Sequence, residues 1–235
     1  MSIKESVNIQ DSSLLNAIAP ALKLMSHIEA SRELVVHVDF AKSKAISPIY
    51  ALALSIFCDR CNKSITFQSL PSYLESICFP FGVDPEGLRK GEFGAKLEGF
   101  SKKTYMPIVS FPANSNNDDK EYILSMVEDL IIRQTGMDRN ISYGFKYLTS
   151  EAIDNISEHS ESKKGYIIAQ TNSRLKYLDI CIADAGITLL GSYKKLPNNE
   201  ILSDIEAIQA ASRGIQARIF LMLKIGAMAF RHPEK

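Results

Sequence analysis

The run Pro112–Glu121, with the sequence PANSNNDDKE, contains no large aliphatic or aromatic residue. A polar stretch rich in turn-forming residues does not pack inside a domain, so it predicts a linker or an exposed loop. The spacing of apolar residues also changes across this run. We therefore expect residues 1–112 to form one domain, residues 113–121 to form a linker and residues 122–235 to form a second domain.

The part before the linker alternates between helical and strand patterns of apolar residues. The predicted elements are helices over 13–30 and 48–61, a short helix followed by a turn over 71–82, and strands over 33–40 and 64–68. Gly82–Tyr105 shows little periodicity. The order strand, helix, strand, helix predicts a small α/β unit whose sheet is covered on one side. His37 alternates with apolar residues on its strand, so we expect it to pack in the core.

The part after the linker has a different order of elements. The predicted elements are helices over 122–134, 142–161 and 199–212 and strands over 165–170 and 177–184. Two helices followed by paired strands predict a two-layer α/β sandwich. The fold class expected for the whole chain is therefore α+β.

Composition excludes several classes of function. The 27 basic and 27 acidic side chains cancel, which argues against a protein that grips nucleic acid through bulk charge. No apolar run reaches the roughly 18–20 residues that span a bilayer, and the polar amino terminus predicts no secretory signal. Four cysteines in a chain of this length do not form a disulfide framework. We expect a reduced, cytoplasmic protein that binds neither nucleic acid nor membrane.

Three polar residues of one predicted helix have the spacing i, i+4, i+8. Glu151, Asn155 and His159 are displaced by only about 40° at each step and so share a helix face. An Asn carbonyl oxygen suits Mg²⁺ without adding charge, and a Glu can deprotonate an attacking hydroxyl. This face is therefore a candidate magnesium-phosphate site. The alternatives are a solvated helix face and, for His159, a capping or packing role.

A second motif, Asp184-Ala-Gly186, ends the predicted strand over 177–184. A carboxylate there can accept a hydrogen bond from an exocyclic amine, and a glycine lets the backbone approach a ligand closely. Each motif alone is common. The combination of the helical triplet with Asp-x-Gly about 25 residues later is much more specific.

Residues 122–213 resemble the GHKL ATPase family, which has the Bergerat ATP-binding fold of histidine kinases, gyrase, Hsp90 and anti-sigma serine kinases. Glu151–His159, EAIDNISEH, resembles the N box of that family, and Ile182–Ile187, IADAGI, resembles its adenine-binding box. No dimerisation helix with a phosphoacceptor histidine is visible. The nearest subtype is therefore the stand-alone or anti-sigma-like form.

The resemblance implies a role for each motif residue. Asn155 would hold Mg²⁺ on the phosphates of ATP, Asp184 would bind the adenine amino group, and Glu151 would be the general base of any phosphoryl transfer. The remaining positions implied in ATP binding are Gly186, His159 and Thr188. Thr188 stands where the family usually has a second glycine, so this chain departs from the pattern at the start of the lid.

The glycine-rich box that wraps the phosphates is missing from the printed sequence. With permitted codon choices, a one-nucleotide shift from Gly214 reads YSSKNFPDAENRGYGIPSSRK, in which RGYGI resembles that box. We therefore predict that residues 215–235 are out of frame and that the fold is incomplete at its carboxyl end. The alternative is a genuine tail without the phosphate loop.

Residues 33–83 resemble a STAS-type domain, the fold of anti-sigma-factor antagonists. The segments that carry the resemblance are Val35–Phe40, Ile46–Pro48 with the apolar helix after it, Tyr73-Leu74 and Phe79–Gly82. Ser47 is the nearest candidate phosphoacceptor, but the expected role is a helix cap. Cys58 and Cys61 have metal-type spacing without a second Cys/His pair, so a structural role is expected there.

These resemblances imply an ATP-binding regulatory protein that acts through a protein partner, in the style of an anti-sigma factor or sensor kinase. Related domains often dimerise, so a homodimer is compatible with the resemblance. One alternative is an active Mg-dependent ATPase or serine kinase. Another is an interaction module whose nucleotide site is vestigial. A fold resemblance raises the expectation of ATP binding without deciding among the three.

Overall fold

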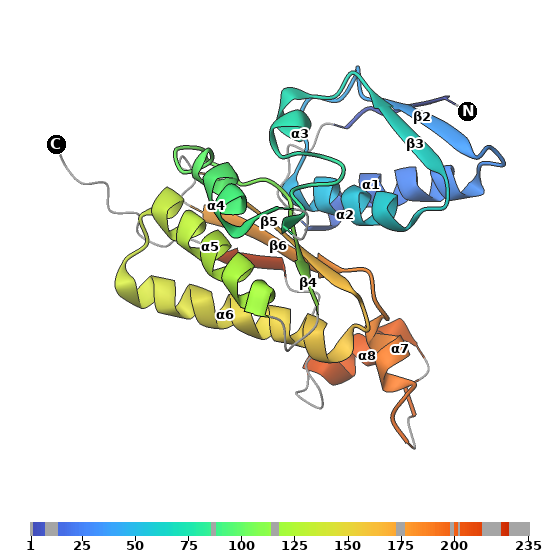
Figure 1. Ribbon diagram of the computed structural model, residues 1–235. Helices are drawn as coiled ribbons and strands as arrows, with labels where there is room; N and C mark the ends of the chain where they lie inside the picture. The colour runs from blue at the N-terminus through green and yellow to red at the C-terminus, as the bar shows by residue number, and fades with distance from the viewer. Residues whose placement is uncertain are drawn as a thin grey trace.

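The computed structural model describes residues 2–7, 14–85, 88–113, 118–172, 177–197, 200–201, 203–212 and 222–225. The described residues form a mixed α/β structure with two small sheets (Figure 1). The mixed class predicted from the sequence is therefore confirmed. The predicted reading-frame change concerns residues 215–235, which, apart from 222–225, lie outside the described part.

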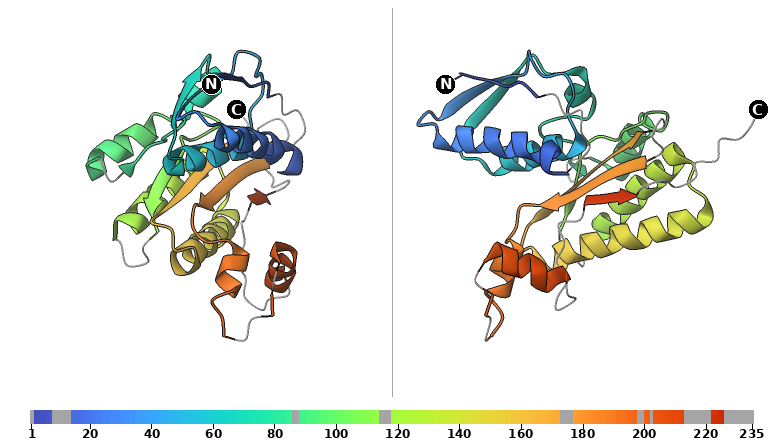
Figure 2. Two further views of the ribbon diagram at one scale, coloured as in Figure 1. Left: turned by 90° about the vertical axis from the view of Figure 1, so that its right-hand side faces the viewer. Right: turned by 180° about the vertical axis from the view of Figure 1, so that it is seen from behind.

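The first sheet consists of three parallel strands in the order β1-β2-β3. Its strands are β1 (Ser2–Lys4), β2 (Val35–Asp39) and β3 (Ser64–Gln68). Helices α1 (Leu14–Ala30) and α2 (Pro48–Arg60) contact each other and lie on one side of this sheet (Figures 1 and 2). The sheet covered on one side, which the order of elements predicted, is thus present.

Side chains of β2 alternate between the covered and the open face. Val36 and Val38 are fully buried, whereas Val35 and His37 are exposed. The expectation that His37 packs in the core is therefore wrong. The strand period of two puts His37 on the open face, where its Nδ1 lies 2.5 Å from the Thr66 hydroxyl of β3.

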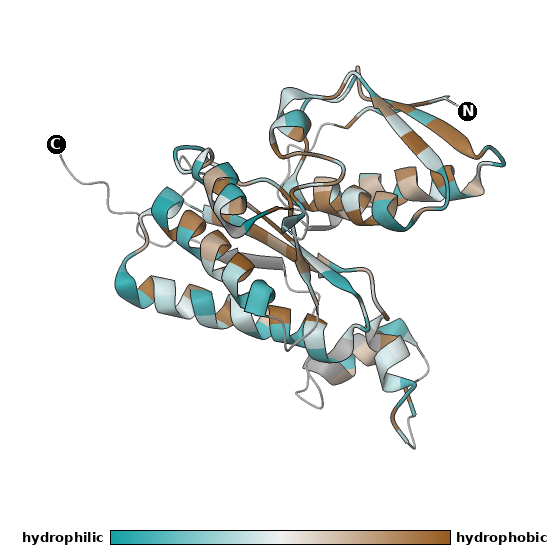
Figure 3. Ribbon diagram, viewed as in Figure 1, coloured by the Kyte–Doolittle hydropathy of each residue, from teal (hydrophilic) through white to brown (hydrophobic). Residues whose placement is uncertain are grey.

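The second sheet is antiparallel, in the order β4-β5-β6-β7. Its strands are β4 (Val109–Pro112), β5 (Lys164–Asn172), β6 (Tyr177–Asp184) and β7 (Met222–Ile225). Helices α5 (Asp118–Thr135) and α6 (Arg139–His159) cover one face of it. In Figure 3 the brown of the strands contrasts with the paler and teal outer turns of α6.

Both faces of β5 and β6 are buried. Ile167 and Ala169 of β5 join the core under α5 and α6, whereas Tyr166 and Ile168 join the core around α2. In β6 the same division separates Ile180 and Ile182 from Cys181 and Ala183. The antiparallel sheet is therefore the middle layer between its own two helices and a helix that precedes it in the chain.

Helix α2 lies between the two sheets, which explains its composition. Its buried residues are Pro48, Ile49, Tyr50, Ala51, Leu52, Leu54, Ser55 and Phe57, and they point in all directions around the axis. A helix that is apolar all round is typical of a buried element. At its carboxyl end, Asp59 accepts a hydrogen bond of 2.6 Å from the Tyr166 hydroxyl of β5. Helix α2 therefore packs against both sheets at once.

Two polar side chains form hydrogen bonds with backbone groups at the ends of α1 and α2. Ser47 caps α2 by accepting a hydrogen bond of 3.3 Å from the Tyr50 N–H, which confirms its expected capping role. Lys63 lies beside the carboxyl end of α1. Its ammonium donates to the carbonyls of Ile28, Glu29 and Ser31 at 2.5, 3.0 and 2.5 Å.

Several short elements escape the sequence patterns. They are β1, α4 (Lys90–Glu98), β4, α7 (Leu189–Tyr193) and β7. Within residues 71–82 the short helix expected before a turn is α3 (Ser72–Ser76), and the last predicted helix is α8 (Asp204–Ser212). Strand β4 precedes the predicted linker yet pairs with β5. The division at residues 113–121 stays a prediction. Among the described helices, none is long and apolar enough to cross a bilayer.

Candidate functional site

Helix α6 provides the first half of the candidate site. Asp138 caps its start by accepting hydrogen bonds from the Asn140 and Ile141 N–H groups, at 2.9 and 3.0 Å. Its core-facing side includes Phe145, Ala152, Ile153 and Ile156, all buried against the antiparallel sheet. This packing fixes the rotation of the helix, and so decides which face its polar residues occupy.

The predicted triplet follows the edge of that buried side. Glu151 is exposed and Asn155 is half-buried, because each i+4 step rotates the position toward the core. His159 is the last residue of the helix, and its side chain lies outside what the structure describes. Within the described part of the chain, neither the Glu151 carboxylate nor the Asn155 carboxamide has a hydrogen-bond partner. Both groups are therefore available to a ligand.

Asp184 ends β6, and its carboxylate turns back onto the residues that follow. Its Oδ1 accepts a hydrogen bond of 2.6 Å from the Gly186 N–H. Burial raises the pKa of Asp184, although the Gly186 N–H, the Ser160 hydroxyl and the charge of Arg60 act to lower it. A carboxylate has about four acceptor positions, so the hydrogen bond from the Gly186 N–H leaves capacity for a further donor, such as an exocyclic amine.

Gly186 is packed directly against the end of α6. A Cβ at this position would lie only 1.8 Å from the carbonyl oxygen of Ser160, the residue after His159. The same carbonyl accepts a hydrogen bond of 2.7 Å from the Ile187 N–H. The turn after β6 is therefore held against the carboxyl end of α6, and only glycine fits at its closest approach.

Further contacts hold α7 in this neighbourhood. Thr188 caps α7, and its hydroxyl accepts a hydrogen bond of 3.2 Å from the Gly191 N–H. Lys195, just after α7, pairs with Glu161, just after α6. Figures 1 and 2 both place α7 and α8 near this end of α6. Thr188 thus has a local structural role at the position that the resemblance assigns to ATP binding.

The structure brings the two sequence motifs to one place, through backbone contacts. Asp184 and Gly186 meet Ser160, which lies five residues after Asn155 on the same helix end. Among the described residues, no side-chain contact joins Glu151 or Asn155 to Asp184. The arrangement can present a carboxylate acceptor, a carboxamide oxygen and an outer carboxylate in that order along one end of the sandwich.

Three neighbouring residues were not anticipated from the sequence. Ser160 follows the N-box-like segment directly, so its position in the motif was a usable signal. Arg60 comes from α2, and no local pattern connects it to Asp184. Lys120 of α5 is buried, with its ammonium 3.1 Å from the Ser157 hydroxyl and 3.6 Å from the Asp154 carboxylate. The Lys120 side chain therefore links α5 to the side of α6 that bears Asp154 and Ser157.

Cys58 and Cys61 are both partly buried and both are free thiols. Burial is the main cause that raises the pKa of Cys58 to about 12, so the thiol is protonated near neutral pH. Within the described residues no group of three or more His, Cys, Asp or Glu side chains could hold a metal ion.

Comparison with known proteins adds no relative to this description. The chain matches no protein-family model, no curated protein and no solved structure. What the site can do therefore has to be argued from its own chemistry. It offers hydrogen-bond acceptors to a donor at Asp184 and oxygen ligands to a cation at Asn155.

Proposed function

We propose that the chain is an ATP-binding regulatory protein of the GHKL type that acts through a protein partner. Its carboxyl-terminal part would be a Bergerat-type sandwich, and its amino-terminal part a STAS-type unit. The antiparallel sheet with α5 and α6 on one face supports the first assignment. The parallel sheet with α1 and α2 on one side supports the second.

The observation that carries the proposal is the contact between Gly186 and Ser160. It sets the Asp184 carboxylate beside the end of the helix that bears Asn155, although the two motifs are separated in sequence. If the helix face were merely solvated and the strand end unrelated to it, no close contact through a glycine would be required between them. A site that binds one ligand through both motifs does require such a contact.

The residues present fit both groups that the proposal requires. Asp184 supplies an oriented acceptor for the adenine amino group. Asn155 is half-buried and its carboxamide is unpaired among the described residues, so its oxygen suits Mg²⁺. When bound, Mg²⁺ would neutralise charge on the phosphates. The part of the chain expected to wrap the phosphates lies beyond Ser212.

The direct test is the stability of the purified chain with Mg-ATP, Mg-ADP and Mg-GTP. A ligand at 100 times its Kd adds about 2.7 kcal/mol to the free energy of unfolding. We expect both adenine nucleotides to raise Tm and Mg-GTP to have little effect, because the Asp184 carboxylate favours an exocyclic amine over a carbonyl. Asp184→Asn should abolish the shift, whereas Asp154→Asn on the α5-facing flank should retain it. A folded sample that does not respond to adenine nucleotides contradicts the proposal.

The variant Glu151→Gln distinguishes the active-kinase alternative from a protein that only binds ATP. If Glu151 is a general base, this variant keeps the nucleotide-induced shift and loses Mg-dependent phosphoryl transfer. An unchanged transfer rate, measured with radiolabelled ATP, excludes Glu151 as the base. Loss of the nucleotide shift together with transfer assigns Glu151 to binding.

A second candidate function is an interaction module with a vestigial nucleotide site. Tyr143, Tyr147 and Leu148 are exposed on α6, on the side that continues toward Glu151, and exposed aromatic residues are typical of protein contacts. This candidate predicts partner binding that ignores ATP and survives Asn155→Ala. The leading proposal predicts partner binding that changes with nucleotide.

The proposed reading-frame change has its own test. The coding DNA across Gly214 and past the stop codon should run open in the shifted frame through the codons for RGYGI. If so, nucleotide binding should be stronger in the repaired protein than in the present chain, since the phosphate-wrapping box is restored. A closed shifted frame makes the tail genuine and favours the interaction module.

A further inference from the structure

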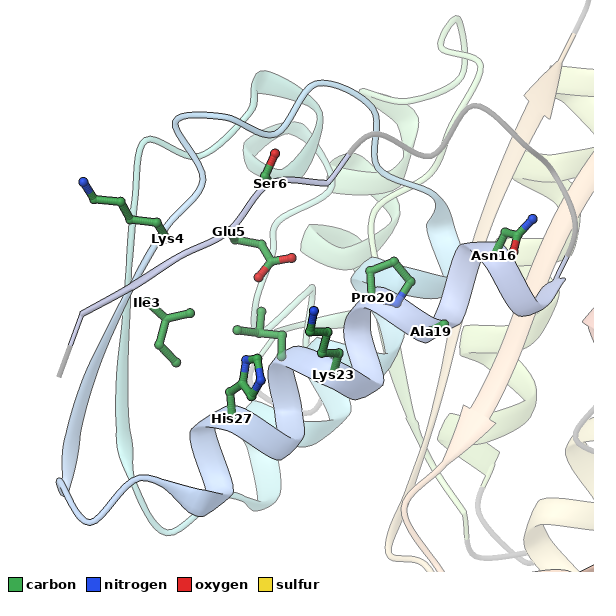
Figure 4. Close-up of a pocket in the computed structure, with 10 residues that line it drawn as sticks. Ile3, Lys4, Glu5, Ser6, Asn16, Ala19, Pro20, Lys23 and His27 are labelled. Atoms are coloured by element: carbon green, nitrogen blue, oxygen red, sulfur yellow. The ribbon is translucent and has the colours of Figure 1, made fainter.

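A pocket of about 590 Å³ lies between α1 and the chain segment formed by β1 and the residues after it (Figure 4). This volume is within the range of roughly 300–1,000 Å³ that is usual for small-molecule sites. None of its lining residues belongs to the candidate site on α6 and β6. The pocket is therefore a separate feature, and the proposed nucleotide binding does not use it.

Opposite charges face each other across this pocket. Glu5 approaches from the strand side, while Lys23 and His27, one helical turn apart, approach from α1 (Figure 4). Both basic groups lower the pKa of the half-buried Glu5 carboxylate, although burial raises it more. Within the described part of the chain, no ion pair or hydrogen bond joins the Glu5 carboxylate to either of them. These acidic and basic side chains thus line one pocket and are not paired with one another among the described residues.

The charges exclude simple ions as the best ligand. A lone anion attracted by Lys23 and His27 would also meet the Glu5 carboxylate. A lone cation attracted by Glu5 would meet the Lys23 ammonium. A small molecule with an ammonium and a carboxylate at its two poles satisfies both walls together.

Part of the remaining lining is apolar, although Lys4, Ser6 and Asn16 also belong to it. The apolar part consists of the buried residues Ile3 and Leu24, with Ala19 and Pro20 along α1. An aliphatic side chain placed there removes apolar surface from water, at about 25 cal/mol for each Å². The pocket therefore combines a dipolar recognition element with an aliphatic one.

We propose that this pocket binds a free α-amino acid with an aliphatic side chain, whose ammonium contacts Glu5 and whose carboxylate contacts Lys23 and His27. The site adds a small-molecule input to the amino-terminal part of the protein. It is distinct from the nucleotide site in both ligand and location, so an experiment can refute either proposal without refuting the other.

The test uses the full chain and three probes of similar shape. They are L-leucine, 4-methylpentanoate, which lacks the ammonium, and 3-methylbutylamine, which lacks the carboxylate. Titration calorimetry should give saturable binding of leucine, with each analogue weaker by about tenfold, the equivalent of 1.4 kcal/mol. Absence of saturable leucine binding, or equal binding of either analogue, overturns the proposal.

Variants assign the two poles of the ligand. Glu5→Gln should weaken leucine by about tenfold or more and should not weaken 4-methylpentanoate, whose carboxylate no longer meets a like charge, whereas Lys23→Met should weaken both. Glu33→Gln and Lys42→Met change exposed residues of the same charge outside the pocket and should have no effect. If Glu5→Gln and Lys23→Met are folded by circular dichroism yet bind leucine as wild type does, the pocket is not the site. If one of them does not fold, His27→Gln supplies the second measurement.

Discussion

Asp184 and Glu5 are two half-buried carboxylates whose pKa values are raised by burial, yet the molecule holds them differently. Asp184 accepts a backbone hydrogen bond from Gly186 and is enclosed by the end of α6. Glu5 lies across a pocket from the basic side chains of Lys23 and His27, with no hydrogen bond to either among the described residues. Similar burial therefore produces one carboxylate fixed in orientation and another that can exchange partners. The first suits recognition of a fixed donor, and the second suits a mobile zwitterion.

The largest expected effect comes from breaking the enclosure of Asp184. Gly186→Ala forces a Cβ against the Ser160 backbone and should lower the free energy of unfolding by about 3 kcal/mol. Gly144→Ala, in open space on α6, should instead be neutral or stabilising by up to about 1 kcal/mol. Urea unfolding of both variants measures the difference. Equal stability of the two would show that the turn relaxes freely and that Asp184 is not held by it.

The next effect concerns the helix wall that faces Glu5. Lys63→Met removes the donor to three carbonyls at the end of α1 and should cost about 1–2 kcal/mol. Lys42→Met is the matched control, since Lys42 is exposed and has no hydrogen-bond partner among the described residues. Amide hydrogen exchange should rise at the carboxyl end of α1 in the first variant only. Unchanged exchange there would mean that water replaces the ammonium without loss.

A smaller effect is expected where the two regions meet. Tyr166→Phe removes the hydrogen bond from β5 to Asp59 of α2 and should cost about 1 kcal/mol in thermal or urea unfolding. Tyr147→Phe removes an exposed hydroxyl from α6 and should leave stability unchanged. A larger loss in the Tyr166 variant, together with two separate unfolding transitions, would indicate that this bond couples the regions.

The smallest effect is the pH dependence of stability. Because folding raises the pKa of Asp184 and of Glu5, the folded chain keeps protons that the unfolded chain has released, and stability falls as pH rises through the raised values. Asp184→Asn and Glu5→Gln should therefore gain stability over wild type at pH 7 and lose that gain near pH 4. Urea unfolding at several pH values between pH 4 and pH 7 measures this gain in the free energy of unfolding. The pKa values of Asp39 and Glu98 are lowered, but both residues are present in the wild type and in each variant. Their contributions therefore cancel when the stability of the wild type is subtracted from that of a variant. A pH-independent difference contradicts the assigned direction.

The sequence predicted elements well where one periodicity extends over many residues. The bounds of β3 and β6 match the predicted strands, and α1, α2 and α6 agree to within a few residues. Short elements such as α4 and β4 were missed, because they form through contacts with α5 and β5 that lie far along the chain. Tertiary packing rather than local propensity decides such elements.

The candidate site was predictable to a similar extent. Local motifs located Asn155, Asp184 and Gly186, since each lies at the end of a clearly periodic element. Arg60 could not be found, because it lies on α2, far from Asp184 along the chain, and acts on that carboxylate only through its charge. His37 was misplaced because a strand with alternating residues does not itself say which face is covered.

The position of α2 between two sheets has a consequence for the covalent chain. An isolated fragment starting at residue 122 would expose Tyr166, Ile168, Cys181 and Ala183, an apolar strip that α2 covers in the whole chain. It would also lack β4, the partner of β5. Proteolysis within residues 113–121 should therefore yield two pieces that stay associated under native conditions and separate only in denaturant. If the two pieces do stay associated, the packing of α2 rather than the covalent connection at residues 113–121 holds them together.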